Sequence, residues 1–455
     1  MIFFLMFAIV CLINVDFAIL RSMRSTLAVV DLGNSAALIP YFELLGTFPG
    51  AVLITIALAW LMNRLAIHKV FLIAVGGFVL FYTLFAFGFY PFLEGWKGGI
   101  QSLAWLPGHD WLGNHLGAFA AMIFYTMAEL WKVALLSVLF WGLANQYLSL
   151  EEAKRFYAPT ILGGSVGAIF AGPLISACTS FTSSWATSMS MMLMAVSVLG
   201  LFTVWLYYLL WRRLSKRAPR EVKKREPFSL RAGITACRNS PYLLLLLWMV
   251  CADYIAYALG ELIFLEVLRE RFPSPQEYCA YMGTLGTWSG GLTALFALFI
   301  TPWLIHRHRW VVASLVTPVL IFLSAGSFFA MVCSHDYWAS SVAWVTFTVA
   351  CGSIQFCLCR AAKYTLFDTA KEIAFIHLPD QERMQGKLVV DGIGSRMGRG
   401  GASVLSIGLI GAAGSVLASA LATGLIAGLV ALSSVLATWR LGRLVDSRVN
   451  GDVTN

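Results

Sequence analysis

The residues best suited to chemistry in this sequence are charged side chains that fall within long apolar runs. The stretch from 381 to 401 carries Lys387 and Asp391, with Arg396 and Arg399 close behind. A charged side chain at the centre of a bilayer costs roughly 2.5–3.5 kcal/mol, so a membrane protein keeps one where it is paired, hydrated or useful. These residues therefore predict either a packed polar seam or a solute site.

Other charged residues lie within or beside three further apolar runs. Glu129 and Lys132 are three residues apart on one predicted helix face, so in one interpretation they only neutralise each other, as do Lys387 and Asp391 at four apart. In chain order the further charged residues are Asp16, Arg21, Arg24, Glu129, Lys132, Asp253 and Glu261.

The spacing and the signs of these charges favour a solute pathway. Asp253 and Glu261 are eight residues apart, about 80° round a helix axis, so both can face one cavity. Arginine and lysine in such a cavity suit an anionic solute such as phosphate. Carboxylates there keep the cations of an empty cavity from lipid or take part in proton coupling. We therefore predict a pathway lined by both signs and an anionic solute.

The composition places these charges in a membrane. Of the 455 residues, 59% are hydrophobic and only 12% are charged, and the mean hydropathy is +0.78. Apolar runs of about 20 residues match helices that cross the hydrocarbon core, whereas transmembrane strands alternate over about ten residues. The fold class is therefore predicted to be an all-α polytopic membrane protein.

The apolar runs predict twelve transmembrane helices in two six-helix halves, as in major-facilitator transporters. The predicted segments are an N-terminal half at 1–210, a basic cytoplasmic loop at 211–240, a C-terminal half at 241–440 and a cytoplasmic tail at 441–455. Residues 363–375 are expected to form a charged connector. The helices are expected at 2–20, 36–62, 69–93, 113–147, 157–178, 186–210, 241–265, 276–304, 310–332, 338–360, 387–411 and 415–440.

Basic residues and glycines add orientation and packing to this arrangement. Most of the 32 Lys and Arg residues fall in alternate loops, which by the positive-inside rule puts both termini in the cytoplasm. Arg21 and Arg24 fall on the outer side in this scheme. GxxxG spacings predict close helix contacts at Gly46/Gly50, Gly163/Gly167, Gly394/Gly398 and Gly424/Gly428.

Enzymatic and metal-binding functions find little support in the sequence. Gly386 and Lys387 are followed by Leu388 and Val389 rather than by the rest of a phosphate-binding loop motif, and HExxH is missing. The nine cysteines lack CxxC spacing. We expect no enzyme, no cofactor, no metal site and no nucleic-acid partner.

Several long segments are similar to a known family, and together they extend over nearly the whole chain. The sequence resembles the bacterial and plastid ADP,ATP carrier (nucleotide transporter) family. The segments that carry the resemblance begin at Ile19-Leu20-Arg21 and continue with MAELWKVALLSVLFWGLANQ, EEAKRFY, PSPQEYCAYMGTLGTW, KYTLFDTAKEIAFI and GKLVVDGIGSRMGRGG.

The resemblance implies a twelve-helix permease that moves ATP, ADP or other nucleoside phosphates such as GTP, CTP and UTP. It implies an integral protein of the inner membrane of an obligate intracellular bacterium. The family's functional charges match Arg24, Glu129, Glu261 and Lys387 here. The resemblance thus implies phosphate binding by Arg24 and Lys387, while Glu129 and Glu261 set the charge of the cavity or gate it.

The first helix departs from the family pattern. The family's RDxKD reads Arg21-Ser22-Met23-Arg24-Ser25, so both acidic residues are lost. Asp16 stands where many relatives carry Asn, which favours proton-coupled net import as an alternative to exchange. A second interpretation pairs Asp16 with Arg21 or Arg24. A further alternative function is that of a carrier of the same architecture for another organic anion or cofactor.

Overall fold

The computed structural model describes residues 1–32, 35–93, 95, 109–216, 235, 237–308, 310–334, 342–376 and 378–451. Its chain divides into two compact units, Met1–Glu221 with Phe272–Gly291, and Val222–Arg271 with Leu292–Asn455. The regular structure within the described ranges is helical. Most of the predicted basic loop, residues 217–234, lies outside the described residues.

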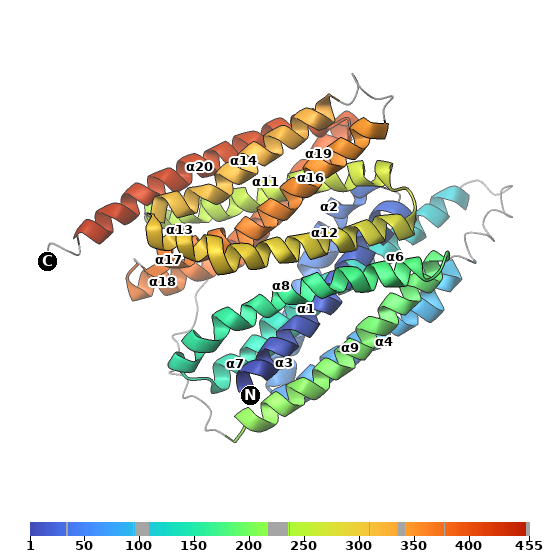
Figure 1. Ribbon diagram of the computed structural model, residues 1–455, viewed down its shortest axis with the longest axis horizontal. Coiled ribbons are helices and arrows are strands. Elements are labelled where there is room, and N and C mark those ends of the chain that lie inside the picture. Colours follow the sequence, from blue (N-terminus) through green and yellow to red (C-terminus); the bar gives the residue numbers. More distant parts are fainter. Residues whose placement is uncertain are drawn as a thin grey trace. The chain divides into compact units, whose positions relative to one another are not determined.

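The first unit is organised around its N-terminal helix. The helix α1 packs between α8 and α9, and a third helix, α6, also contacts it (Figure 1). The elements are α1 (Ile2–Thr26), η1 (Leu27–Asp31), η2 (Ala36–Leu38), α2 (Ile39–Tyr41), η3 (Phe42–Thr47), α3 (Phe48–Met62), α4 (Ile67–Leu84), η4 (Phe85–Phe89), α6 (His109–Lys132), η5 (Val133–Phe140), α7 (Trp141–Tyr147), α8 (Leu150–Ser180), α9 (Trp185–Leu214) and most of α12 (Pro275–Leu295).

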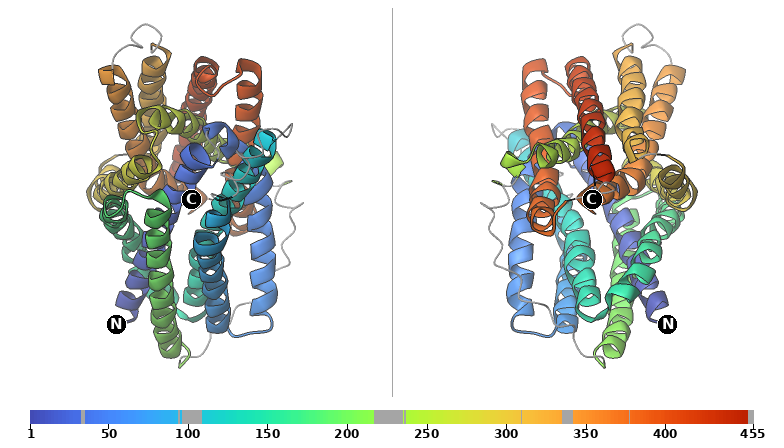
Figure 2. Two further views of the ribbon diagram at one scale, coloured as in Figure 1. Left: turned by 90° about the vertical axis from the view of Figure 1, so that its right-hand side faces the viewer. Right: turned by 90° about the vertical axis from the view of Figure 1, so that its left-hand side faces the viewer.

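The second unit is built around α11, α14 and α20, which lie side by side in Figures 1 and 2. Apart from the end of α12, its elements are α11 (Pro241–Arg271), η6 (Phe296–Ile300), α13 (Thr301–Arg307), α14 (Trp310–Cys333), α16 (Val342–Ala362), η7 (Lys363–Phe367), α17 (Asp368–Ile376), α18 (Asp380–Lys387), η8 (Leu388–Gly394), α19 (Ser395–Ala413) and α20 (Ala420–Gly451).

Eleven described helical segments are long and apolar enough to cross a membrane. The remaining predicted helix, at 387–411, lies in α18, η8 and α19, which together are helical from Asp380 to Ala413. This segment is not among the eleven, and it carries four charged residues between 387 and 399. A polytopic helical protein is thereby confirmed, and the count of twelve stays a prediction.

Two predicted boundaries are wrong in a way that bears on the charges. The first membrane helix continues to Asp31 instead of ending at residue 20, so Arg24 lies within it rather than outside. The tenth continues to Ile376 and takes in the predicted connector, whose first residue, Lys363, is buried. In both places the cation has a buried partner from another helix, described below. Each helix continues past the point at which the hydropathy of the sequence falls.

Small residues bring the helices together at the predicted glycine pairs. A Cβ atom on Gly167 would lie 2.4 Å from the backbone oxygen of Cys11, and one on Gly398 would lie 2.8 Å from that of Cys251. Gly46, Gly50, Gly163, Gly394 and Gly424 are similarly crowded, whereas Gly428 has open space around it. The prediction of close contacts is therefore confirmed for seven of the eight glycines.

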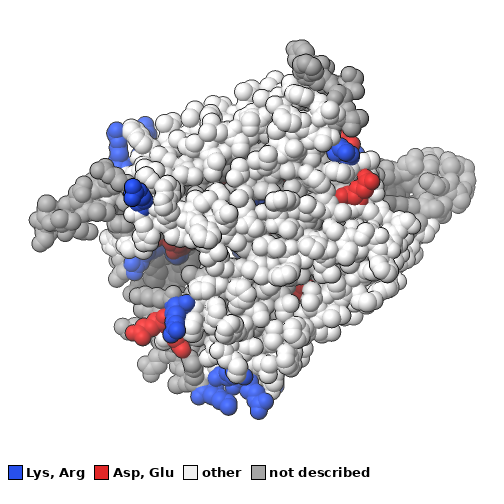
Figure 3. All heavy atoms as spheres, in the orientation of Figure 1, with Lys and Arg blue, Asp and Glu red and all other residues white. Residues whose placement is uncertain are grey.

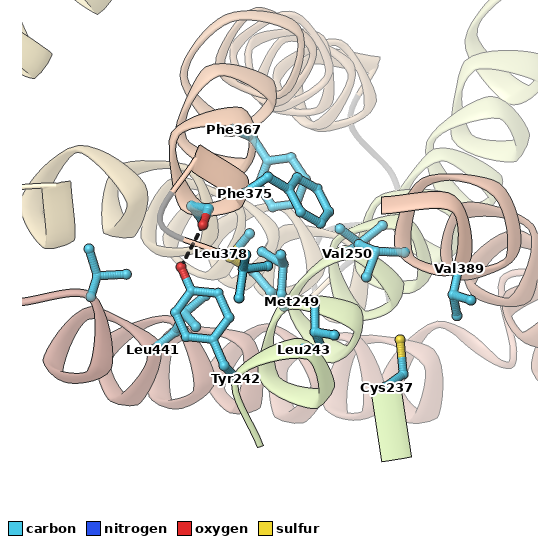
Figure 4. Packing of buried hydrophobic residues seen from close by; sticks show 14 residues of the cluster. Cys237, Tyr242, Leu243, Met249, Val250, Phe367, Phe375, Leu378, Val389 and Leu441 are labelled. Carbon is cyan, nitrogen blue, oxygen red and sulfur yellow. Dashed lines mark hydrogen bonds between the residues drawn. The ribbon is translucent and has the colours of Figure 1, made fainter. Parts of the chain in front are cut away.

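Apolar side chains fill the interior of the units and also cover much of their surface. In the second unit, Phe367, Phe375 and Leu378 pack against α11, where the Tyr242 hydroxyl donates to the Ala374 carbonyl oxygen at 2.7 Å (Figure 4). Many large apolar side chains are exposed as well. On the face drawn in Figure 3 the charged side chains gather near the margins. Such a surface suits contact with lipid.

Candidate functional site

A buried ion pair joins α1 and α6 in the first unit. Arg24 of α1 pairs through Nη1 with Oε1 of Glu129 on α6, and only 5% of Arg24 is exposed. The guanidinium carbon lies 4.2 Å from the centre of the Tyr125 ring, one turn before Glu129. The Tyr125 hydroxyl donates to Oε1 of Glu43 at 3.1 Å. The positive charge is thus held by a carboxylate and an aromatic face.

Asp16 is completely buried two turns before Arg24, and neither of its carboxylate oxygens has a hydrogen-bond partner among the described residues. The interpretation that paired it with Arg21 or Arg24 is therefore wrong. Arg24 is turned to Glu129 instead. The ammonium of Lys132, at the end of α6, lies 4.9 Å from the ring of Phe17, the residue next to Asp16. The carboxyl group of Asp16 is thus buried without a compensating charge or hydrogen bond from the described residues.

The second unit holds a buried ion pair that the sequence interpretation missed. Nζ of Lys363, the first residue of η7, lies 2.9 Å from Oδ2 of Asp253 on α11, and the side chains are 7% and 2% exposed. The ammonium also lies 3.3 Å from the centre of the Tyr254 ring and 5.4 Å from that of Tyr257. Asp253 is among the charged residues that the sequence singles out. Lys363 follows the apolar run and therefore falls at the start of the predicted connector.

The predicted pairing of Lys387 with Asp391 is wrong. Lys387 pairs with Glu372, and both side chains are about half exposed. Asp391 pairs with Lys371, whose Nζ lies 2.7 Å from Oδ1 of Asp391. Asp391 lies within a π-helix, Leu388–Gly394, which Lys387 immediately precedes. The cations and carboxylates of α17 supply the partners instead.

Glu261 lines a small pocket in the second unit, two turns beyond Asp253 on α11. Aromatic rings and one amide share the pocket, but Asp253 does not, so the prediction that both acids face one cavity is wrong for this pocket. The lining residues are Tyr257, Gly260, Glu261, Phe264, Ile321, Gly352, Gln355, Phe356 and Cys359.

The two arginines of α19 differ in their surroundings. Arg396 is exposed, whereas the guanidinium carbon of Arg399 lies 5.9 Å from the ring of Tyr254, which also contacts Lys363. A sequence signal for Lys363 existed, because it opens the segment KYTLFDTAKEIAFI that carries the family resemblance.

Several of these cations stand where the helix changes its winding. Lys363 opens η7, Lys132 immediately precedes η5 and Lys387 immediately precedes η8. Isolated π turns occur frequently at functional sites, since they redirect side chains within a continuous helix. The sequence pattern, interpreted with the regular α-helical period, gave no indication of them.

The arrangement as a whole provides cations that can exchange partners. Within each unit an arginine or lysine is held by a carboxylate of a different helix. A phosphate group offers the same charge-assisted contacts as a carboxylate, with more oxygens to accept hydrogen bonds. Such pairs can therefore bind an anionic solute without leaving a cation unpaired when the solute departs.

Known proteins are similar to this chain over most of its length. A family model described as TLC ATP/ADP transporter matches residues 1–444. The chain is 32% identical over 465 residues to ADP,ATP carrier protein 1 of Chlamydia muridarum, covering 95% of this chain and 85% of that protein. It is 30% identical over 419 residues to the chloroplastic ADP,ATP carrier protein 1 of Arabidopsis thaliana, covering 88% and 67%.

Solved transporter structures share the fold at low sequence identity. A mutant of the nucleoside transporter NupG aligns with a TM-score of 0.63 and 11% identity, and the alignment covers 97% of this chain and 100% of NupG. A POT family transporter aligns with a TM-score of 0.61 and 12% identity, covering 96% of each chain. These likenesses confirm the predicted polytopic helical fold. The full-length family match and the identity with the carriers establish that the chain belongs to the TLC ATP/ADP transporter family.

Proposed function

We propose that this chain is a nucleotide transporter that carries ATP and ADP across a membrane by alternating access. The observation that carries the proposal is the Arg24–Glu129 pair, a buried cation held by an exchangeable carboxylate in a chain of the TLC ATP/ADP transporter family. Its relatives from Chlamydia and Arabidopsis are named ADP,ATP carriers. GTP, CTP and UTP are further candidate solutes.

The proposed roles follow from the contacts of each residue. Arg24 and Lys387 neutralise phosphate oxygens, and Glu129 holds Arg24 when the solute is absent. Glu261 sets the charge of its pocket. Four residues support them by pairing or by adding charge nearby: Arg21, Lys132, Asp253 and Asp391.

The proposed location is the inner membrane of an intracellular bacterium, with both termini and a basic loop at 211–240 in the cytoplasm. The distribution of Lys and Arg between alternate loops supports this orientation. The twelve-helix division into halves at 1–210 and 241–440 belongs to the same proposal.

Proton-coupled net import is the second candidate, and Asp16 is the observation that favours it. A fully buried carboxylate without a partner can take up and release a proton as the surrounding helices move. The driving forces differ, because exchanging ATP for ADP moves about one net charge, worth roughly 2.3 kcal/mol per 100 mV. Symport follows the proton gradient instead.

Uptake by bacterial cells that express the chain tests both candidates. Labelled ATP, GTP, CTP and UTP are supplied with and without a protonophore and with or without ADP inside, and cells carrying an empty vector are the control. Uptake of ATP supports the proposal, and absence of uptake for every nucleotide overturns it. Uptake that requires internal ADP and ignores the protonophore removes the symport candidate.

A further inference from the structure

The ion pair between Asp253 and Lys363 is incompletely satisfied for a purely structural contact. The Lys363 ammonium has three donors but faces one carboxylate oxygen, Oδ2 of Asp253. Oδ1 of Asp253 is buried and has no hydrogen-bond partner among the described residues. A buried ion pair contributes stability only when its remaining donors and acceptors are satisfied. This pair therefore has unused capacity on both sides.

The surroundings of Lys363 are suited to an anion with several oxygens. The ring of Tyr254 faces the ammonium at 3.3 Å and also approaches the Arg399 guanidinium, 5.9 Å from the ring centre. Two cations from different helices are thus gathered around one tyrosine of α11. Arginine and lysine together can share the oxygens of one phosphate group.

The Lys363 ammonium lies near one wall of the Glu261 pocket. Tyr257 lies 5.4 Å from the Lys363 ammonium and also lines that pocket, together with Gln355 and Phe356. Lys363 follows Cys359, another pocket residue, by about one helical turn. A polar anion site thus adjoins a pocket that offers aromatic rings, an amide and a carboxylate.

We propose that Lys363, with Arg399 beside the shared Tyr254 ring, is a phosphate-binding site within the second unit and that Asp253 occupies it in competition with the phosphate group. The inference rests on the proposed nucleotide transport and assigns a substrate contact to a residue of the tenth membrane helix. Asp253 is then a placeholder that keeps the buried ammonium paired while no nucleotide is bound.

The competition gives opposite expectations for the two partners. In Lys363→Gln the phosphate loses a cation, so ATP binds at least about tenfold more weakly, while adenosine binding changes by less than about twofold. In Asp253→Asn the competitor is removed, so ATP binds about threefold more tightly or better, and the ATP-induced rise in Tm exceeds that of the parent. Lys363→Arg keeps the charge and retains most of the affinity.

Purified full-length protein in detergent serves for these measurements, with radiolabelled ATP binding, competition by adenosine and thermal unfolding. The matched control is Glu266→Gln, which removes a buried carboxylate that pairs with Arg269, also on α11. This variant should bind ATP with an affinity within about twofold of the parent's. Loss of ATP and adenosine binding in equal measure in Lys363→Gln, or weaker ATP binding in Asp253→Asn, overturns the proposal. Should Lys363→Gln not fold, the sign of the Asp253→Asn effect decides.

Failure of the proposed function is distinguishable from failure of this inference. If the parent takes up no nucleotide in cells, the transport proposal falls, and the Lys363 site is then decided by inorganic pyrophosphate as the probe. A pyrophosphate-induced rise in Tm that Lys363→Gln abolishes supports a phosphate site, and no rise in the parent overturns it. If the parent transports ATP and Lys363→Gln binds it normally, only the inference falls.

Discussion

Each unit buries one cation against a carboxylate from another helix and the face of a tyrosine. In the first unit these are Arg24, Glu129 and Tyr125, with the tyrosine one turn from the carboxylate. In the second unit Lys363 pairs with Asp253 and lies against Tyr254. A cation, a carboxylate and a tyrosine ring thus recur in both units, although the helices that supply them differ.

The two pairs differ in how far they are closed to solvent. The Glu129 side chain is 15% exposed, whereas that of Asp253 is 2% exposed. A guanidinium also offers a planar fork to an incoming anion, whereas an ammonium acts as a point charge. The two cations are buried alike, at 6% for Arg24 and 7% for Lys363, so the pairs differ on the side of the carboxylate, and the proposed exchange for a phosphate has to uncover Asp253 further than Glu129.

The largest effect is expected from Arg24→Gln. Removing one partner of a buried pair destabilises a protein by about 3–5 kcal/mol, and under the proposed function a phosphate contact is lost as well. We expect nucleotide uptake to fall at least about 100-fold, measured with labelled ATP in cells and normalised to protein in the membrane.

The matched variant, Glu129→Gln, leaves the cation in place and should retain measurable uptake. Equal losses in both variants would show that the pair only holds α1 to α6. In that case the parallel between the two units would be structural rather than functional.

Lys387→Ala should separate transport from stability. Its pair with Glu372 is about half exposed on both sides, and exposed pairs contribute less than about 1 kcal/mol. We expect uptake to fall at least about tenfold with little change in the thermal unfolding midpoint. Glu372→Gln is the control for loss of the pair alone. Full transport by Lys387→Ala contradicts its assignment as a phosphate contact.

A smaller effect is expected from the helix seam behind Tyr254. A Cβ atom on Gly398 would lie 2.7 Å from Cβ of Tyr254, so Gly398→Ala must displace the ring that holds Lys363. Overpacking of this kind costs about 1–3 kcal/mol. Thermal unfolding and ATP uptake should both be reduced.

Gly400 lies two residues further along α19, where an added Cβ meets nothing within 4 Å. Gly400→Ala should therefore be neutral or stabilising by about 0.5–1 kcal/mol, because alanine favours the helix. Equal destabilisation by both substitutions would remove the special role given to the contact between Gly398 and Tyr254.

The sequence singled out both residues of the first unit's ion pair but only Asp253 of the second's, for a physical reason. Arg24 and Glu129 stand within or beside apolar runs, where an isolated charge is conspicuous, and the family resemblance matched both. Lys363 comes after such a run, and hydropathy alone suggests a helix end there. Its tertiary partner, Asp253 on a distant part of the chain, compensates the charge and so allows the lysine to be buried within a helical span that continues to Ile376.

The spacing of residues four apart predicted the helix contacts of the glycines correctly and the pairing of the charges near η8 wrongly. Glycine pairs four apart give close helix contacts because glycine has no side chain to hold the neighbouring helix away, as at Gly163 and Gly167 against α1. Lys387 and Asp391 are also four apart, but each pairs with an oppositely charged residue of α17, Glu372 and Lys371. Which tertiary partners lie nearby is set by how the helices pack, so these pairs could not be predicted from the spacing of the residues.

The smallest change in stability is expected from Asp16→Asn, which tests the contrast between the two buried aspartates. Asp253 has a lysine partner, whereas Asp16 has no partner among the described residues. An uncharged amide of similar size loses no ion pair there, so the unfolding midpoint should stay the same or rise. If Asp16 carries the coupling proton, the variant should keep uptake driven by internal ADP and lose its sensitivity to a protonophore, measured with labelled ATP. If the protonophore sensitivity of uptake is instead the same as in the parent, Asp16 is a buried acid without a role in coupling. The contrast between the two aspartates then concerns packing alone.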